Sequence, residues 1–201
     1  MRLSVIIPVK NLSSSKARLA PSLGLKERRG LTVKMIRHVL STLNKSIGEV
    51  LVIGSDDEVR AISEEYNVLF ELDKDTSLNG AIVQAIDRCV RSGSDAVLLI
   101  AADLPLLSYY ELEKLIDNTE DEEVVICPSK DCGTNALFLH PPKTMPVSFG
   151  ANSFTRHLRM AMERGRRFKV FWSPGFSFDI DTPEDLKMLN ALRIGSTSAK
   201  H

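Results

Sequence analysis

Short apolar runs alternate with longer amphipathic stretches along this chain, and the alternation restricts its fold more than any other feature of the sequence. Each run holds four to seven residues rich in β-branched or leucine side chains, which is typical of buried strands. The predicted strands are residues 3–9, 50–53, 68–72, 96–101, 124–127, 136–139 and 168–171. Strands that alternate with helices predict an α/β fold with a mainly parallel central sheet and helices on both faces.

Helical periodicity and capping signals mark the stretches between these strands. Apolar side chains recur every three or four positions in residues 31–43, 59–66, 81–86 and 112–116. Capping signals predict helix starts at Ser55-x-x-Glu58, at Ser108-x-x-Glu111 and at Thr182 followed by Pro183. Prolines and glycines interrupt the pattern in residues 127–172, so we expect a loop-rich insertion there, across one end of the sheet.

Length, charge and cysteine content narrow the class of protein. A chain of 201 residues, 43% of them hydrophobic, can close one core, so we expect one domain over residues 1–194 and a flexible tail at 195–201. Basic and acidic residues balance at 26 each, so we expect neither nucleic acid nor a membrane as partner. The three cysteines lack metal or redox spacing, and no signal peptide or membrane span is evident, which predicts a cytoplasmic protein.

The loop after the first predicted strand gathers positive charge. In open α/β sheets, ligands bind beyond the carboxyl ends of the strands. The loop comprises Pro8, Val9, Lys10, the serine run 13–15, Lys16 and Arg18. Lysine and arginine bind phosphate oxygens, and small residues let backbone N–H groups approach the same anion, so this loop could wrap a triphosphate. It carries neither a P-loop nor a dinucleotide-binding glycine pattern, and a solvated basic loop is the alternative.

Three aspartates stand at positions suited to a metal. Asp103 follows the fourth predicted strand, and Asp179 and Asp181 flank one apolar residue at an expected strand end. A spacing of two sends both carboxylates of the pair to one face of an extended strand. Carboxylates held so close need a compensating cation, and Mg²⁺ prefers a few carboxylates together with phosphate oxygens. The alternative is that Asp103 is a turn residue and Asp181 only caps the last helix.

Small polar residues mark two further candidate contacts. Asn79 could bond a base or ribose, and Gly80 would let a ligand lie against backbone, although an ordinary helix N-cap explains this segment equally well. The segments 132–136 and 148–153 read as turns, and the second opens a helix whose N-terminal amides could hold an anion. Plain loops are the alternative. The four histidines form no constellation, and we assign them no catalytic role.

The motifs taken together resemble a known family. They are Pro8-Val9-Lys10, residues 15–19, residues 102–106, Gly133-Thr134-Asn135, residues 148–153 and residues 178–186. In this order they resemble 2-phospho-L-lactate guanylyltransferase, a family that serves biosynthesis of the redox deazaflavin coenzyme. The resemblance covers nearly the whole chain and implies the single-domain, Rossmann-like nucleotidyltransferase fold, GTP as donor and Mg²⁺ as cofactor.

The resemblance also implies roles for individual residues. Metal binding falls to Asp103, Asp179 and Asp181, and donor-phosphate contacts to Lys10, Lys16 and Arg18. Asn79 becomes a nucleotide contact, and Thr134, Gly150 and Ser153 become acceptor contacts. The expected reaction moves GMP from GTP to 2-phospho-L-lactate and releases pyrophosphate. The triple-serine loop departs from the glycine-rich loop of the broader superfamily, which weakens the case for a backbone cradle.

Several alternatives remain open from the sequence alone. Relatives of this family use phosphoenolpyruvate or 3-phosphoglycerate as acceptor in place of 2-phospho-L-lactate. An Asp-x-Asp pair also occurs in glycosyltransferases that bind a nucleotide sugar through a metal, and a non-catalytic nucleotide-sensing domain would share the same fold. No residue determines guanine over other bases, and the oligomeric state is open, with a homodimer as one option.

Overall fold

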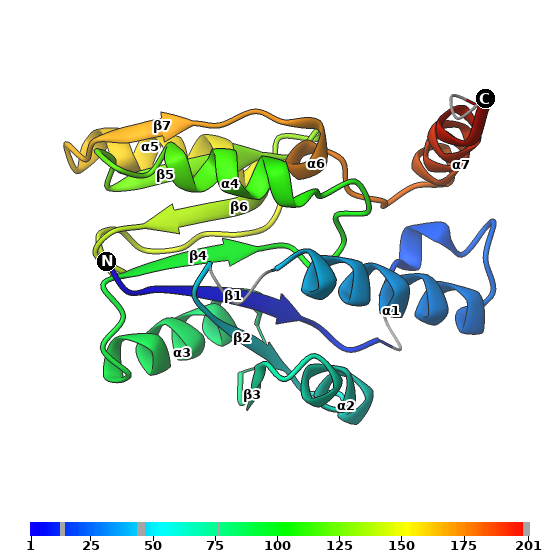
Figure 1. The fold of residues 1–201 in the computed structure, drawn as a ribbon, viewed down its shortest axis with the longest axis horizontal. Coiled ribbons are helices and arrows are strands. Elements are labelled where there is room, and N and C mark those ends of the chain that lie inside the picture. Colours follow the sequence, from blue (N-terminus) through cyan, green and yellow to red (C-terminus); the bar gives the residue numbers. More distant parts are fainter. Residues whose placement is uncertain (13–14, 44–46, 76, 199–201) are drawn as a thin grey trace.

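The computed structural model describes residues 1–12, 15–43, 47–75 and 77–198, and a seven-stranded sheet forms its centre (Figure 1). The strand order is β3-β2-β1-β4-β6-β5-β7. The strands are β1 (Leu3–Val9), β2 (Glu49–Gly54), β3 (Leu69–Leu72), β4 (Ala96–Ile100), β5 (Val124–Pro128), β6 (Thr134–Leu139) and β7 (Phe168–Val170). Each corresponds to one of the seven predicted runs, so the strand prediction is confirmed.

Most neighbouring strands run parallel, as the alternation of strands and helices predicted. β1 pairs in parallel with β2 and β4, β2 with β3, and β5 with β7. β6 is antiparallel to both β4 and β5. Parallel neighbours need a long crossover, whereas β5 and β6 are joined by a short turn that reverses the chain. The carboxyl ends of β1, β4 and β5 therefore share one edge, and the amino end of β6 meets them there.

Helices cover both faces of the sheet, as expected (Figure 1). One apolar core joins α1 (Leu25–Thr42), α2 (Asp57–Glu65), α4 (Tyr109–Asp117) and α6 (Pro174–Ser177) to one face. A second core joins α3 (Leu78–Arg91) and α5 (Ser153–Glu163) to the other face. Successive strand residues such as Ile6 and Ile7 enter opposite cores, since side chains alternate across a sheet.

Residues 127–172 were expected to form a loop-rich insertion, and that prediction is wrong. The segment contains β6, α5 and β7, which complete the sheet and cover it. Its prolines and glycines lie mainly in the connections, where Gly150 and Gly165 take positive φ angles. These prolines and glycines therefore end helices and strands, and the α/β fold continues through the segment.

The predicted helix caps are largely confirmed. Ser108 and Glu111 form a reciprocal capping box at the start of α4. Thr182 Oγ1 accepts the Asp185 N–H at the start of α7 (Pro183–Ser198). α2 is capped by Asp56, one residue after the predicted Ser55, because its carboxylate accepts the backbone N–H two residues on.

The last helix packs through its first turns and then continues to Ser198. Leu189 belongs to a small third core with Leu19, Met35, Phe178 and Ile180. Helical backbone thus runs past the domain boundary expected at residue 194, and residues 199–201 of the expected tail lie outside the described part of the chain. No helix within the described ranges is both long and apolar enough to cross a membrane.

Candidate active site

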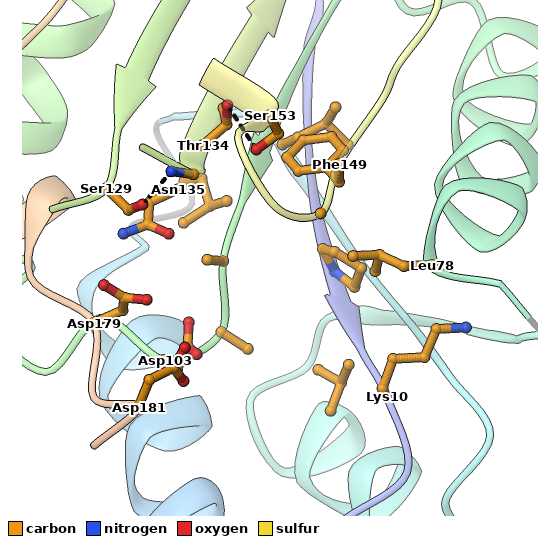
Figure 2. Close-up of a pocket in the computed structure, with 18 of the residues that line it drawn as sticks. Lys10, Leu78, Asp103, Ser129, Thr134, Asn135, Phe149, Ser153, Asp179 and Asp181 are labelled. Carbon is orange, nitrogen blue, oxygen red and sulfur yellow. Dashed lines mark hydrogen bonds between the residues drawn. The ribbon is translucent and has the colours of Figure 1, made fainter. Parts of the chain in front are cut away.

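A cavity of about 400 Å³ opens at the shared carboxyl edge of the strands (Figure 2). It is lined by Pro8 and Val9 at the end of β1 and Lys10 after it, by residues 99–103 of and after β4, and by Ser129 and Asp131 after β5. Thr134 and Asn135 of β6, Phe149, Gly150 and Ser153 before and in α5, and Asp179 and Asp181 close its other sides. Segments far apart in sequence converge because parallel strands expose their ends at one edge.

The three predicted aspartates meet at one end of this cavity. One carboxylate oxygen from each of Asp103, Asp179 and Asp181 lies within 4.8 Å of the others. Figure 2 shows the three side chains gathered together, with Asp103 arriving from the end of β4. The predicted convergence of these carboxylates is therefore present in the tertiary structure.

The local structure of the aspartate pair differs from the prediction. Asp179 and Asp181 lie on the connection between α6 and α7, and residues 171–182, all of them described, form no strand. Ile180 between them is fully buried in the third core, together with Leu189 of α7. Burial of this one side chain directs its two neighbours to the opposite side, so alternation is kept without sheet pairing.

Lys16 lies inside the acidic cluster. Its ammonium nitrogen pairs closely with Asp103 and lies 2.9 Å from Asp181 Oδ1, and its side chain is 6% exposed. Burial by itself would lower the pKa of Lys16, but the two carboxylates outweigh it and raise that pKa above the ordinary value. The Lys16 backbone adopts the left-handed region, with φ of 55°, a conformation that costs about 1 kcal/mol or more outside glycine. A lysine held this way remains charged beside the carboxylates.

One carboxylate oxygen of Asp179 lacks a hydrogen-bond partner in the part of the chain that the structure describes. Its Oδ1 atom is buried and has no hydrogen-bond partner among the described residues, and the nearest cation, Lys130, stands 3.6 Å away. Burial and then the negative charge of Asp103 raise the pKa of Asp179. A divalent cation would answer both effects, and three clustered carboxylates are the hard oxygen ligands that Mg²⁺ prefers. The residues therefore fit the expected metal.

The opposite end of the cavity is lined by the hydroxyl groups of Thr134 and Ser153, and the buried His157 contacts Thr134 from behind. Ser153 Oγ donates to Thr134 Oγ1 at 3.2 Å, as the dashed line in Figure 2 marks. Thr134 Oγ1 also lies 3.0 Å from Nδ1 of the buried His157. The Ser148 N–H donates to His157 Nε2 at 3.0 Å. This end carries polar groups suited to an anion or a carbonyl oxygen, without a formal charge on them.

Comparison with known proteins identifies the family. Residues 3–198 match the model of the family described as Guanylyl transferase CofC like. The chain belongs to this guanylyltransferase family. It is therefore a nucleotidyltransferase, as the motifs predicted, which sets aside the glycosyltransferase and nucleotide-sensing alternatives.

Three curated relatives carry different acceptor names. A phosphoenolpyruvate guanylyltransferase of Sphaerobacter thermophilus is 35% identical, over 92% of this chain and 90% of its own length. A 2-phospho-L-lactate guanylyltransferase of Methanothermobacter thermautotrophicus is 36% identical, over 92% and 83%. A 3-phospho-D-glycerate guanylyltransferase of Colwellia psychrerythraea is 33% identical, over 96% and 93%.

A solved structure supports the fold. A nucleotidyl transferase from Methanothermobacter thermautotrophicus superposes with a TM-score of 0.66 at 15% identity, over 97% of this chain and 99% of its own. At that identity the likeness concerns the fold alone.

The other two cations of the loop that follows β1, Lys10 and Arg18, lie outside the acidic cluster. Lys10 lines the cavity but directs its amine away from the aspartates, 2.9 Å from Asp73 Oδ2 (Figure 2). Arg18 is 73% exposed and approaches Asp181 only at 3.7 Å. Ser13 and Ser14 of the predicted backbone cradle lie outside the described residues. Of the three predicted phosphate contacts, Lys16 is the one enclosed by the site.

Asn79 and Gly80 lie in the first turn of α3, after the capping residue Ser77. The Asn79 side chain accepts from the Phe149 N–H at 2.7 Å and donates to the Phe149 carbonyl at 3.2 Å. It thus joins α3 to the loop before α5. A Cβ on Gly80 would lie 2.1 Å from the Asp75 carboxyl, which explains the small residue by packing.

Sequence reasoning missed Lys130, which supports the aspartate pair. Its ammonium group bonds the Asp179 carbonyl oxygen and lies 2.7 Å from Asp185 Oδ1. Burial opposes the charge of Asp185, but hydrogen bonds from Lys130 and from the N–H groups of Asp181 and Thr182 lower its pKa to about 2. Lys130 follows the end of β5, so the same strand-end rule that selected Asp103 would have found it.

His157 was assigned no role from the sequence, and its contact with the cavity-lining Thr134 was not foreseen. It follows no strand and belongs to no local motif. Only the packing of α5 on the face of the sheet that β5 and β6 share brings it to Thr134.

Proposed function

We propose that this guanylyltransferase moves GMP from GTP to 2-phospho-L-lactate, with release of pyrophosphate, in deazaflavin coenzyme biosynthesis. One observation carries the proposal: three carboxylates and a buried lysine meet at one end of a cavity whose other end is lined by hydroxyl groups. The charged end suits the phosphates of a nucleotide with its metal. The hydroxyl end suits the anionic groups of a small phosphorylated acid.

Mg²⁺ is part of the proposal, and Asp103, Asp179 and Asp181 would hold it. When bound, the ion would neutralise phosphate charge and orient the reacting groups. Lys130 keeps Asp179 in place through its carbonyl oxygen and Asp185 through its carboxylate. Lys16 adds a fixed positive charge at the same point, because its ammonium group is held between two of the aspartates.

The chain's own groups would act mainly by position and charge. A phosphate oxygen of the acceptor attacks the α-phosphorus of GTP in line, a new P–O bond forms, and the bond to pyrophosphate breaks. The attacking oxygen is already anionic at neutral pH, so the step needs no general base. Lys16 stabilises charge that builds on the transferring and leaving phosphates. Thr134 and Ser153 hold the acid so that its phosphate faces the nucleotide.

The acceptor is the finer part of the proposal. Of the three acids named for the relatives, 2-phospho-L-lactate carries a methyl group and phosphoenolpyruvate a methylene group on the carbon that bears the phosphate. 3-Phosphoglycerate carries its phosphate on C3 and a free hydroxyl on C2. A single small group in a pocket changes binding by only a few kcal/mol. We propose 2-phospho-L-lactate because the motifs resemble that family, and the other two acids are the direct competitors.

A pyrophosphate-release assay tests the proposal. Each nucleoside triphosphate is combined with each of the three acids, with and without Mg²⁺. We expect the highest kcat/KM with GTP and 2-phospho-L-lactate, and no turnover without a divalent ion. Higher kcat/KM with another acid would replace the acceptor, and metal-independent turnover would remove Mg²⁺ from the proposal.

A further inference from the structure

His157 bridges two walls of the cavity. It lies in α5 and is fully buried. Its Nδ1 atom faces Thr134 Oγ1 of β6 at 3.0 Å, and its Nε2 atom accepts the Ser148 N–H at 3.0 Å. The Phe149 ring meets the imidazole edge to face, with centroids 5.0 Å apart. One side chain therefore contacts both the strand and the loop that line the hydroxyl end.

The bond from Ser148 determines which nitrogen of His157 carries the proton. A backbone N–H can only donate, so Nε2 must be the acceptor. A neutral imidazole then has its hydrogen on Nδ1 and donates it to Thr134. The ring is neutral at physiological pH, because burial and then the nearby Arg156 charge lower the pKa of His157 to about 4.

The Thr134 hydroxyl is left with one direction in which to donate. A hydroxyl offers one hydrogen and accepts two bonds. Thr134 Oγ1 accepts from Ser153 Oγ and from His157 Nδ1. Both acceptor positions are filled, and the remaining hydrogen is available to the cavity that Thr134 lines.

We propose that His157 is a positioning residue that makes Thr134 a hydrogen-bond donor to the acceptor acid. The inference rests on the proposed function, since it requires an acid bound at this end of the cavity. It specifies the chemistry of that contact: the ligand atom facing Thr134 is an oxygen that accepts, from a carboxylate or a phosphate. A hydroxyl group that must donate would find no acceptor on Thr134.

The same ring also holds the loop before α5. Arg156 donates to the Ser148 carbonyl at 2.9 Å and to Ser148 Oγ at 2.9 Å, so the loop has a second anchor that does not involve His157. Loss of the His157 bond to the Ser148 N–H alone therefore leaves the loop tied down. The larger effect of His157 on the acid passes through Thr134.

Two amide variants separate the two bonds. In His157→Asn the amide nitrogen stands near the place of Nδ1 and can still donate to Thr134. In His157→Gln the amide oxygen stands near the place of Nε2 and can still accept from Ser148. We expect His157→Gln to raise KM for the acid roughly 10-fold, because the hydrogen bond that orients the Thr134 hydroxyl is lost. We expect kcat and KM for GTP to change less than about 3-fold. We expect His157→Asn to keep KM for the acid within about 3-fold of wild type.

A double variant makes the test independent of folding. If His157 acts through Thr134, adding His157→Gln to Thr134→Val changes KM for the acid no further. Melting temperatures of all variants are measured beside the kinetics. Equal KM increases in both amide variants that follow their melting temperatures, or additive effects in the double variant, would overturn the inference. Wild-type protein that turns over none of the three acids would instead defeat the proposed function.

Discussion

The two ends of the cavity differ in chemistry: one presents charged side chains and the other presents hydroxyl groups. At one end, Asp103, Asp179 and Asp181 lie together and Lys16 pairs with two of them, Asp103 and Asp181, so formal charges are concentrated and partly desolvated. At the other, Thr134 and Ser153 present hydroxyl groups oriented by a neutral histidine. Charge in a buried setting contributes several kcal/mol, whereas one oriented hydrogen bond contributes about 1 kcal/mol. Changes at the acidic end should therefore affect kcat, and changes at the hydroxyl end should affect KM.

The largest effect is expected from Asp103. Asp103→Asn keeps the shape of the side chain and removes one of the three carboxylates. We expect kcat to fall roughly 10²–10³-fold and the Mg²⁺ concentration needed for half-maximal rate to rise. Steady-state assays over a Mg²⁺ series measure both. Asp117→Asn, at the exposed end of α4, is the matched control and should be neutral. Unchanged kcat in a folded Asp103→Asn protein would contradict the metal assignment.

Lys16 tests whether fixed positive charge matters at the same end. Lys16→Met retains much of the length and removes the ammonium group that pairs with Asp103 and Asp181. We expect kcat to fall on the order of 10²-fold, about 3 kcal/mol, with KM for the acid little changed. Lys26→Met, on the exposed start of α1, serves as control. An effect confined to KM for the acid would contradict the proposal that the acidic end acts on kcat.

Thr134 tests the hydroxyl end. Thr134→Val keeps the volume and removes the hydroxyl, so we expect KM for the acid to rise about 10-fold while kcat and KM for GTP stay nearly constant. Thr144→Val is a matched control, because Thr144 is equally buried, lies outside the cavity, and its hydroxyl has no hydrogen-bond partner within the described residues. A fall in kcat as large as that of the Asp103 variant would contradict the proposed division, in which the hydroxyl end affects KM and the acidic end affects kcat.

Asp179 links function to stability at the acidic end. Folding raises its pKa, so the folded protein holds this proton more tightly than the unfolded chain does. The free energy of unfolding therefore falls as pH rises from the ordinary aspartate range through the raised pKa of Asp179. We expect Asp179→Asn to raise Tm at pH 7 by roughly 2–4 °C, about 1 kcal/mol, while turnover is lost.

Calorimetry at pH 7 and near pH 4 checks this prediction. The stabilisation should shrink at acid pH, because the wild-type carboxyl is protonated once the pH falls below its raised pKa. Lys130 keeps its 2.7 Å partner Asp185 in the variant, so no cation is left unpaired. A lower Tm of the variant at pH 7 would mean that the ionised Asp179 carboxylate stabilises the fold, which would contradict this prediction.

The sequence predicted the acidic end better than the hydroxyl end. Asp103 follows a strand, and Asp179 and Asp181 share a motif, so strand ends and spacing could select them. The strand expected before the pair is absent, yet burial of Ile180 gives the same side-chain directions. His157 has no such local signal, because its partner Thr134 belongs to another element and its tautomer depends on a backbone N–H of a third segment.

By itself, the sequence determined the class of fold, the seven strands and the three aspartates, because these depend on local periodicity and on the rule that parallel strands expose their ends together. Tertiary structure decided the rest. Which lysine enters the acidic cluster, how Asn79 joins α3 to the loop before α5, and which way the Thr134 hydroxyl donates all depend on distances between segments. Hydrogen bonds and ion pairs weaken steeply over a few ångströms, so their pattern exists only once the chain has packed.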